Sequence, residues 1–299
     1  MRIITDKEIQ ALCISPQESV GWARQSFSIK YEAQLPPKSS VHPQGIDFFT
    51  SMPCLLPKQY DCYGVKVVSR IQGRKPALKS ELLLYKTSTG ELLALMEADW
   101  ITQMRTGAVA ALAIETLQKN DAQVYSFVGL GSTAHATMMC LQAILPKDKQ
   151  CRVKLLRYKN QAEQFAEIFA HPQMQFEIVD SHDELLKDAD VLVSAVTEMT
   201  ELFCADETKY PKGLLLVPIH TRGFQNCDLF FDHIFADDKG HVEHFKFFNQ
   251  FKAFNELSEV LLGKVAGRKS NDERILAYNI GLGLHDVWFA NKIFEKIYG

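Results

Sequence analysis

From residue 120 onward, short aliphatic segments alternate with segments whose apolar residues have helical spacing, and this alternation constrains the fold more than any other feature. The aliphatic segments include VYSFVGLG, CRVKLLRY, DVLVSAV and GLLLVPI. Strands with apolar residues on both sides must be buried on both faces, and strands joined through helices pair in parallel. This part of the chain is therefore predicted to be a doubly wound parallel sheet of the α/β class.

The first hundred residues have a different pattern. Residues 65–71 (VKVVSRI) are rich in β-branched side chains, and ELLLYKTSTGELLALME has two apolar runs around a turn, which indicates a hairpin. The apolar helix expected over residues 284–297 needs a partner, and we expect it to pack on the N-terminal region. Residues 1–119 and 278–299 would then form one discontinuous α+β domain, with a domain of residues 120–277 inserted into it.

Composition excludes several classes of function. The net charge of -3 argues against a nucleic-acid partner, and no apolar run is long enough to span a membrane. The N-terminus lacks an apolar secretion segment. Seven scattered cysteines without a CxxC pair favour reduced thiols, and HVEH lacks a third metal ligand. These features predict a cytoplasmic protein without a metal site.

The segment VYSFVGLGSTAHA contains the pattern GxGxxA directly after a predicted strand and at the start of a predicted helix. Gly129 would allow the tight turn, Gly131 would let a pyrophosphate approach the backbone, and Ala134 would allow close packing of helix and strand. Ser132 and Thr133 would begin the helix whose N-terminus faces the phosphates. The pattern predicts a Rossmann-type dinucleotide site; the alternative is a tight turn without a ligand.

The end of the second strand of this domain indicates which dinucleotide is bound. An NAD site usually has an acidic residue there, which holds the ribose hydroxyls. This chain has Arg157 and Lys159 instead, and cations suit a 2′-phosphate. NADP(H) is therefore favoured and NAD(H) is possible, while a solvated basic loop is the alternative interpretation. Val196 and Thr197 follow the DVLVSAV strand, where they would meet the middle of the cofactor.

The predicted helix DWITQMRTGAVAALAIETL (residues 99–117) contains a charge on an apolar face. Arg105 shares this face with Ile101, Val109 and Leu112. A buried guanidinium needs an anion, because an unpaired buried charge costs several kcal/mol or more. The anion is either the carboxylate of a bound ligand or a carboxylate of the protein itself.

Several motifs together resemble the ornithine cyclodeaminase and mu-crystallin family. They are ITQMRTGAVAALA followed by FVGLGSTAHA, SMP at residues 51–53, GVK at 64–66, and the tail that includes Gly281 and Asp286. The resemblance implies a Rossmann domain inserted into a substrate domain that also forms homodimers through its sheet. It further implies an NAD(P)-dependent oxidoreductase that transfers hydride at the Cα–N bond of a small amino or imino acid, as in ketimine reductases and amino-acid dehydrogenases.

The resemblance also implies roles for individual residues. Arg105 would bind the substrate carboxylate through its planar guanidinium, and Lys66 matches the catalytic-site lysine of the family. Lys38 occupies a position where relatives often have arginine, so it would keep the positive charge without the bidentate geometry of a guanidinium. The remaining residues expected at the substrate and the cofactor are Met52, Thr106 and Gly281.

One segment departs from the family. Cyclodeaminases have an aspartate soon after the fifth Rossmann strand, whereas this chain has His220, Thr221 and Arg222 there, with Asp228 several residues later. His220 is a candidate acid or base, because the pKa of histidine is near neutral pH; a structural histidine is the alternative. Two other functions stay open: a true ornithine cyclodeaminase, and a binding protein without catalytic activity.

Overall fold

The computed structural model describes residues 1–197, 199–220 and 222–299. The chain forms two compact units, Met1–Arg105 with Gly281–Gly299, and Thr106–Ile280. The division falls inside helix α3 (Asp99–Leu117). The sequence predicts domain boundaries after residue 119 and before residue 278. These boundaries of independently folding domains stay a prediction.

The larger unit contains a sheet of eight strands in the order β13-β12-β14-β11-β10-β7-β8-β9, all parallel. This confirms the predicted doubly wound parallel sheet. The chain runs from β7 outward to β8 and β9 and then returns to β10 on the other side of β7, so β7 and β10 border the switch point of the sheet. The strands are β7 (Val124–Val128), β8 (Cys151–Leu156), β9 (Met174–Val179), β10 (Val191–Ser194), β11 (Leu215–Pro218), β12 (His233–Ala236), β13 (Phe254–Glu256) and β14 (Ile275–Tyr278).

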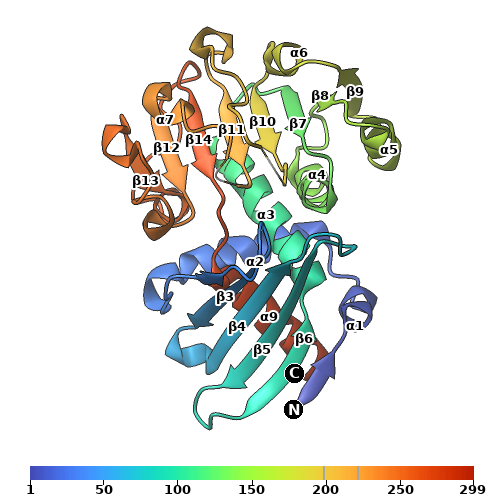
Figure 1. Ribbon diagram of the computed structural model, residues 1–299, viewed down its shortest axis with the longest axis vertical. Helices are drawn as coiled ribbons and strands as arrows, with labels where there is room; N and C mark the ends of the chain where they lie inside the picture. The colour runs from blue at the N-terminus through green and yellow to red at the C-terminus, as the bar shows by residue number, and fades with distance from the viewer. Residues whose placement is uncertain (198, 221) are drawn as a thin grey trace. The chain divides into compact units, whose positions relative to one another are not determined.

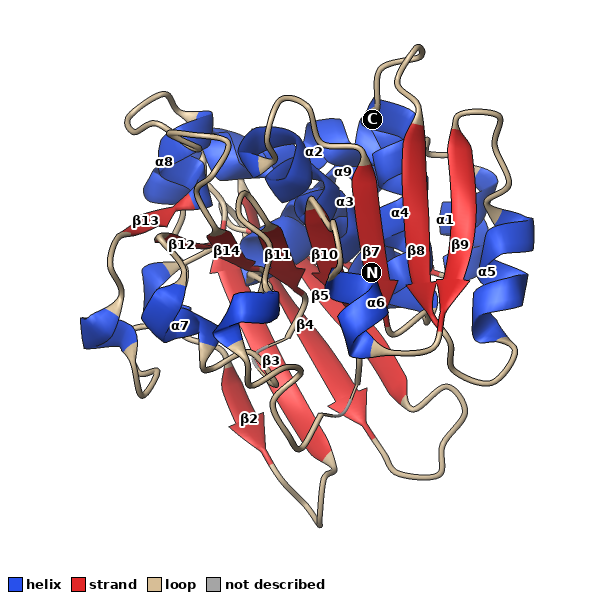
Figure 2. Cartoon of the chain, turned by 90° about the horizontal axis from the view of Figure 1, so that it is seen from above, coloured by secondary structure: helices blue, strands red, loops and turns tan. Residues whose placement is uncertain are grey.

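Helices cover both faces of this sheet. In Figure 2, α6 and α7 lie on one side of the row of strands and α3 lies on the other. Helices α3 and α4 cross closely at Gly107. A Cβ on this residue would come within 2.4 Å of the Ala136 backbone. The helices of this unit besides α3 are α4 (Ser132–Ile144), α5 (Gln161–Ile168), α6 (His182–Leu186), α7 (Cys227–Phe230) and α8 (Leu257–Leu261), with short 3-10 helices η3 (Glu207–Lys209), η4 (Lys239–His241) and η5 (Phe248–Gln250).

Strand β14 is one of the elements that the sequence does not predict. It is the last strand in the chain, yet it pairs with both β11 and β12 inside the sheet. All four of its residues are buried. A short aliphatic run such as ILAY has no periodicity that distinguishes a strand from a buried loop or helix end, so only its pairing identifies it.

The smaller unit contains a mixed six-stranded sheet in the order β1-β6-β5-β4-β3-β2. The predicted hairpin is confirmed as the antiparallel pair β5 and β6, and β1 pairs with β6 in parallel. The strands are β1 (Arg2–Ile4), β2 (Ser39–Val41), β3 (Phe48–Leu55), β4 (Cys62–Arg70), β5 (Leu78–Lys86) and β6 (Leu92–Glu97). The helices are α1 (Asp6–Ala11), α2 (Pro16–Ser28), η1 (Lys30–Glu32), η2 (Lys58–Tyr60) and α9 (Gly283–Tyr298).

The C-terminal helix packs on the N-terminal region, as predicted. Figure 1 shows α9 running behind β3 to β6, with the two chain ends next to each other. Phe289 of α9 meets Trp22 of α2 edge to face with ring centroids 5.2 Å apart. A Cβ on Gly64 would come within 2.8 Å of Val287, so β4 and α9 are in close contact at this glycine.

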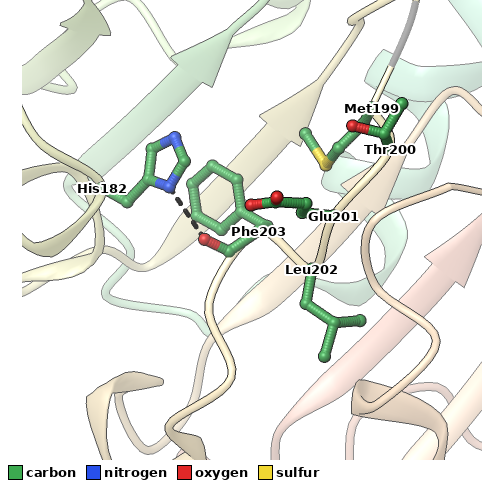
Figure 3. Close-up of a pocket in the computed structure, with 6 residues that line it drawn as sticks. All are labelled: His182, Met199, Thr200, Glu201, Leu202 and Phe203. Carbon is green, nitrogen blue, oxygen red and sulfur yellow. Dashed lines mark hydrogen bonds between the residues drawn. The ribbon is translucent and has the colours of Figure 1, made fainter.

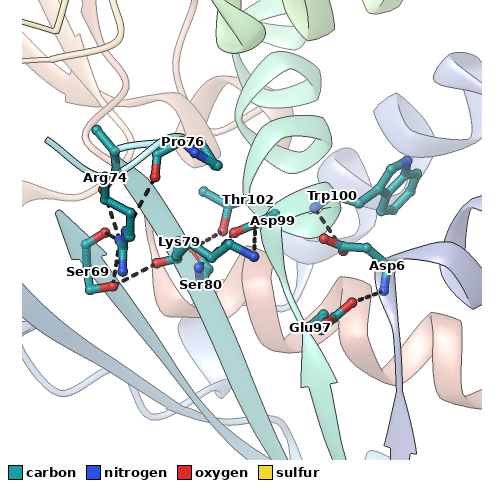
Figure 4. A network of polar contacts seen from close by, with 11 residues as sticks. Asp6, Ser69, Arg74, Pro76, Lys79, Ser80, Glu97, Asp99, Trp100 and Thr102 are labelled. Atoms are coloured by element: carbon teal, nitrogen blue, oxygen red, sulfur yellow. Dashed lines mark hydrogen bonds and ion pairs between the residues drawn. The ribbon is translucent and has the colours of Figure 1, made fainter. Parts of the chain in front are cut away.

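Polar contacts fix the start of α3 in the smaller unit (Figure 4). The Trp100 backbone N–H donates to Asp6 Oδ1 at 3.1 Å, and the Asp6 N–H donates to Glu97 at 2.8 Å. Asp99 accepts a hydrogen bond from the Ser80 N–H at 2.7 Å. Carboxylates at a helix N-terminus satisfy N–H groups that have no partner within the helix. These contacts set the position of α3, and with it that of Arg105 further along the helix.

Across the described residues, no helix combines the length and the apolar character needed to cross a membrane. All seven cysteines, each of them described, are free.

Candidate functional site

Three charged residues form a buried cluster in the smaller unit. Arg105 Nε donates to Asp286 Oδ1 at 2.8 Å, and Lys66 Nζ donates to the same oxygen at 2.7 Å. The side chains of Lys66 and Asp286 are fully buried, and that of Arg105 is 8% exposed. One carboxylate therefore serves two cations.

The secondary structure explains why these side chains meet. Lys66 is in the middle of β4, on the buried side of the strand, and pairs with the buried Met52 of β3. Asp286 is in the first turn of α9, where the helix dipole favours a carboxylate. Arg105 is on the buried face predicted for α3, together with Ile101.

Gly281 gives the Arg105 guanidinium its space. Its φ is +95°, a conformation that side-chain-bearing residues rarely adopt, and a Cβ would lie 2.6 Å from Arg105 Nη1. The sequence places Gly281 at the cofactor; in the structure it lies beside Arg105, and a role in cofactor binding stays a prediction. Thr106, which follows Arg105 on α3, is half-buried and begins the larger unit.

Burial controls the charge state of the cluster. Burial and the nearby Arg105 lower the pKa of Lys66 to about 7, although Asp286 acts in the opposite direction. Lys38, half-buried just before β2, also contributes to lowering it. Burial alone would raise the pKa of Asp286, but Arg105 and Lys66 outweigh this effect and lower it. Asp286 is therefore ionised at neutral pH, while Lys66 is close to its titration midpoint.

The anion next to Arg105 in the structure is thus a protein carboxylate, as in the second of the two interpretations of its burial. The Arg105–Asp286 ion pair does not engage all the polar atoms of the two side chains. Arg105 engages Asp286 through Nε, and the other oxygen, Asp286 Oδ2, is buried without a hydrogen-bond partner among the described residues. With Lys66 protonated, the cluster carries two positive charges and one negative charge. This excess charge suits a bound anion.

Sequence reasoning assigned no role to Asp286, although a signal was present. The segment GLGLHDVWFANKIF is apolar on most sides and contains this single acidic residue. The argument that a buried Arg105 needs an anion applies equally to a buried acid that needs a cation. Pairing the two isolated charges would have predicted the contact.

The glycine loop has the geometry of a dinucleotide site. Gly129 has φ +78°, and a Cβ there would lie 2.5 Å from the Val196 backbone nitrogen, so the loops after β7 and β10 touch at the switch point. Gly131 is the N-cap of α4, where no side chain caps the helix, and a Cβ at Gly131 would meet nothing within 4 Å. The helix N-terminus is thus open to an anionic group.

The other residues of the loop are consistent with this geometry. Ser132 and Thr133 form the first turn of α4, and Ala134 is fully buried. After β10, Val196 is half-buried and Thr197 is exposed. The residues present fit the pyrophosphate and adjoining part of a dinucleotide.

The two basic residues after β8 have partners within the protein. Arg157 Nε donates to Asp180 at 2.6 Å, and its Nη1 contacts Glu163. Lys159 has φ +54°, and its Nζ lies 5.2 Å from the ring centroid of Tyr158. Two carboxylates thus offset the charge of Arg157, which weakens the argument for a 2′-phosphate from the basic residues alone.

His220 is fixed by two hydrogen bonds at the carboxyl ends of β10 and β11. The Arg222 N–H donates to Nδ1 at 3.2 Å, so the proton of the neutral ring is on Nε2, which donates to the buried Ser194 Oγ at 2.8 Å. Burial, with a smaller contribution from Arg222, lowers the pKa of His220 to about 4. The ring is therefore neutral at physiological pH. Thr221, the neighbouring position considered in the sequence, lies outside the described residues.

Asp228 is the nearest acid after the segment in which cyclodeaminases have their aspartate. It is buried in α7 and accepts a hydrogen bond from the Tyr278 hydroxyl at 2.8 Å. Burial raises its pKa to about 7. These contacts indicate a structural role.

A cavity of about 360 Å³ lies in the larger unit (Figure 3). His182 and the segment from Met199 to Phe203 line it, and His182 Nδ1 forms a hydrogen bond with the Phe203 carbonyl at 2.8 Å. None of the described residues that the sequence predicts for the site lines this cavity. No group of three or more metal-binding side chains occurs among residues 1–197, 199–220 and 222–299.

The shared carboxylate predicts unequal effects on stability for two substitutions. Asp286→Asn leaves Arg105 without a counterion and is expected to lower the free energy of unfolding by about 3 kcal/mol or more. Lys66→Met leaves the Arg105–Asp286 pair intact and is expected to be tolerated. Urea denaturation of both variants measures the difference; equal destabilisation would contradict the predicted asymmetry.

The wild type and Lys66→Met should also differ in how their stability depends on pH. The pKa of Lys66 is lower in the folded state than in the unfolded state, so folding releases a proton between these values. Stability of the wild type should therefore rise as the pH increases above about 7. In Lys66→Met this contribution should be absent.

Comparisons with known proteins agree with this organisation. The model of the ornithine cyclodeaminase/mu-crystallin family matches residues 6–299. The nodulation efficiency protein NfeD of Rhizobium meliloti is 23% identical over 87% of this chain and 83% of its own length. A delta(1)-pyrroline-2-carboxylate reductase of Bacillus cereus is 25% identical over 79% of this chain and 78% of its own length.

Solved structures share the fold. Thermococcus litoralis delta(1)-pyrroline-2-carboxylate reductase, in complex with NADH and L-proline, aligns with a TM-score of 0.85 and 23% identity over 99% of this chain and 97% of that chain. An archaeal alanine dehydrogenase dimer with bound NAD aligns with a TM-score of 0.85 and 22% identity over 99% and 95%. Because the family model matches nearly the whole length, the chain belongs to the ornithine cyclodeaminase/mu-crystallin family.

Proposed function

We propose that this chain is an NAD(P)-dependent oxidoreductase that transfers hydride at the Cα–N bond of a small amino or imino acid. The observation that carries the proposal is the buried cluster in which Lys66 and Arg105 share the single carboxylate of Asp286. A substrate carboxylate would balance the excess positive charge. The free cysteines support the cytoplasmic location that we also propose.

Arg105 and Lys66 would have different roles toward the substrate. The guanidinium would bind the carboxylate, with Lys38 as a further cation and Met52 as an apolar wall beside Lys66. Lys66, with a pKa of about 7, can give or accept a proton near neutral pH. In the reductive direction, protonation of an imine nitrogen makes Cα a better hydride acceptor.

The glycine loop would hold the cofactor. Gly129 and Gly131, with the first turn of α4, suit the pyrophosphate, and Val196 is next to this loop, followed in the chain by Thr197. A bound nicotinamide supplies or accepts the hydride. The solved relatives named with NADH or NAD support a dinucleotide here.

The contacts of His220 and Asp228 favour a reductase or dehydrogenase over a cyclodeaminase. His220 is neutral and held by Ser194 and the Arg222 N–H, so we propose that it positions the loop and is not the general base. Asp228 is occupied by Tyr278. No described carboxylate therefore replaces the cyclodeaminase aspartate in this segment. With ornithine, a cyclodeaminase would form proline and ammonia without net oxidation of NAD(P)H.

The function is tested by NAD(P)H oxidation with Δ1-pyrroline-2-carboxylate and with pyruvate plus ammonia. Arg105→Ala should lower kcat/KM by about 100-fold, because a buried charged contact contributes a few kcal/mol. Lys66 can still neutralise Asp286 in this variant, so the fold should persist. The exposed Arg24 provides a control, and Arg24→Ala should retain activity. Absence of turnover with these and with ornithine would favour the non-catalytic alternative.

For the cofactor we propose a preference for NADP(H), with NAD(H) possible. Arg157→Ala should raise the Kd of NADPH about tenfold and leave that of NADH unchanged, because only NADPH has the 2′-phosphate. Glu163→Gln, which removes one competing carboxylate, should act in the opposite direction. Fluorescence titration measures both. Equal affinities of the wild type for NADPH and NADH would contradict the preference.

We also propose that two copies associate through the sheet of the smaller unit. The face opposite α9 has a row of four apolar side chains in direct register, one on each of β3 to β6. All four are only partly buried. They are Pro53, Val65, Leu83 and Leu95. An apolar sheet face of this kind requires a covering partner, and the archaeal relative is described as a dimer.

Leu83→Glu is expected to weaken dimerisation by about 100-fold or more, because a carboxylate would be buried in an apolar interface. Leu78→Glu is the matched control, since Leu78 is also on β5 but is 43% exposed and on the other face. Light scattering coupled to size-exclusion chromatography gives the masses. A monomeric wild type, or dimers of unchanged stability in Leu83→Glu, would exclude this interface.

A further inference from the structure

We propose that the Lys66–Asp286–Arg105 cluster takes up its carboxylate ligand together with one proton, which is added to Lys66. The inference rests on the proposed function, because it concerns the same site and a carboxylate as its ligand. It adds a property that the proposed function does not contain: the affinity for the ligand is linked to the charge of one lysine.

The geometry provides the first step. Lys66 and Arg105 contact the same oxygen of Asp286, at 2.7 and 2.8 Å. Both donors and the carboxylate are buried. One negative charge cannot neutralise two positive charges, and a net charge in a buried site is unfavourable. The excess is relieved either by loss of a proton or by the arrival of an anion.

The groups around Lys66 identify the proton that is lost. Arg105 of α3 contributes the permanent positive charge of a guanidinium. Asp286 of α9 is kept ionised by the two cations. Lys38 adds a further positive charge from the segment before β2, and β3 and β5 contribute the apolar Met52 and Leu82.

Lys66 is thus the only member of the cluster that changes charge near neutral pH. The lowering of its pKa to about 7 agrees with this argument. His285 and Cys54 also lie within electrostatic reach of Asp286.

Linkage then determines the behaviour of the site. A carboxylate ligand stabilises the protonated form of Lys66, so binding raises its pKa and draws a proton from the solvent. By reciprocity, protonation of Lys66 strengthens binding by the same factor. The affinity should be constant below the pKa of the ligand-free site and should fall as the pH rises above it. A ligand with a neutral carboxamide should not be linked in this way.

The experiment follows Lys66 directly in the full-length protein. Lysine labelled with ¹³C at Cε gives a signal whose chemical shift reports protonation, and Lys66→Met identifies the signal by its loss. Without ligand the midpoint should lie near pH 7. Acetate or L-proline should raise it by about one unit or more, whereas L-prolinamide should leave it unchanged.

Lys38→Gln serves as a second, less disruptive variant. Removal of this cation should raise the midpoint of Lys66 in the ligand-free protein, because Lys38 opposes its protonation. A Lys66 that titrates near its ordinary value of about 10.4 without ligand would overturn the proposal. A midpoint that neither carboxylate moves would also overturn it.

The two proposals can fail separately. Turnover of an imino acid with an unchanged Lys66 midpoint would refute proton-linked binding and leave the enzymatic function standing. A raised midpoint without turnover of any tested substrate would refute the enzymatic function and leave the linked anion site in place.

Discussion

The smaller unit depends on one carboxylate. Asp286 is fully buried and neutralises Arg105 while it also contacts Lys66, so three elements that are distant in the chain are joined at a single oxygen. Without it, Arg105 would be buried with no counterion. Because the neutralisation is incomplete, the same contact that stabilises the unit also prepares it for an anion. The incomplete neutralisation of charge at Asp286 thus underlies both the buried cluster and the proposed binding of a carboxylate.

Close backbone approaches complement this charge cluster. Gly281 leaves room for the Arg105 guanidinium, and Gly129 lets the loop after β7 touch the loop after β10. In each case φ is positive and a side chain would collide with a neighbouring group. In the proposed enzyme the two glycines would therefore have different functions, Gly281 beside the cation of the anion site and Gly129 in the loop of the dinucleotide site.

The contacts also separate this chain from the cyclodeaminase pattern within its family. His220 occupies the segment where the aspartate would be expected, and its ring is neutral and fixed by Ser194. In the proposed reaction, proton transfer at the substrate nitrogen would be carried out by Lys66, whose pKa is lowered to about 7.

The sequence alone determined the alternation of strands and helices, the hairpin of β5 and β6, the return of the C-terminal helix and the glycine loop. Each of these is a local pattern, in which the spacing of apolar residues or glycines reports directly on the backbone. The same reasoning showed that Arg105 is buried and must have an anion.

Only the tertiary structure decided which anion that is. Asp286 is 181 residues from Arg105 in the chain, and no local pattern records which distant charges meet. The place of β14 inside the sheet and the pairing of Arg157 with Asp180 were decided in the same way. Local spacing fixes the conformation of a segment, whereas its partners depend on how the whole chain packs, because pairing energies are realised only when distant segments are brought together.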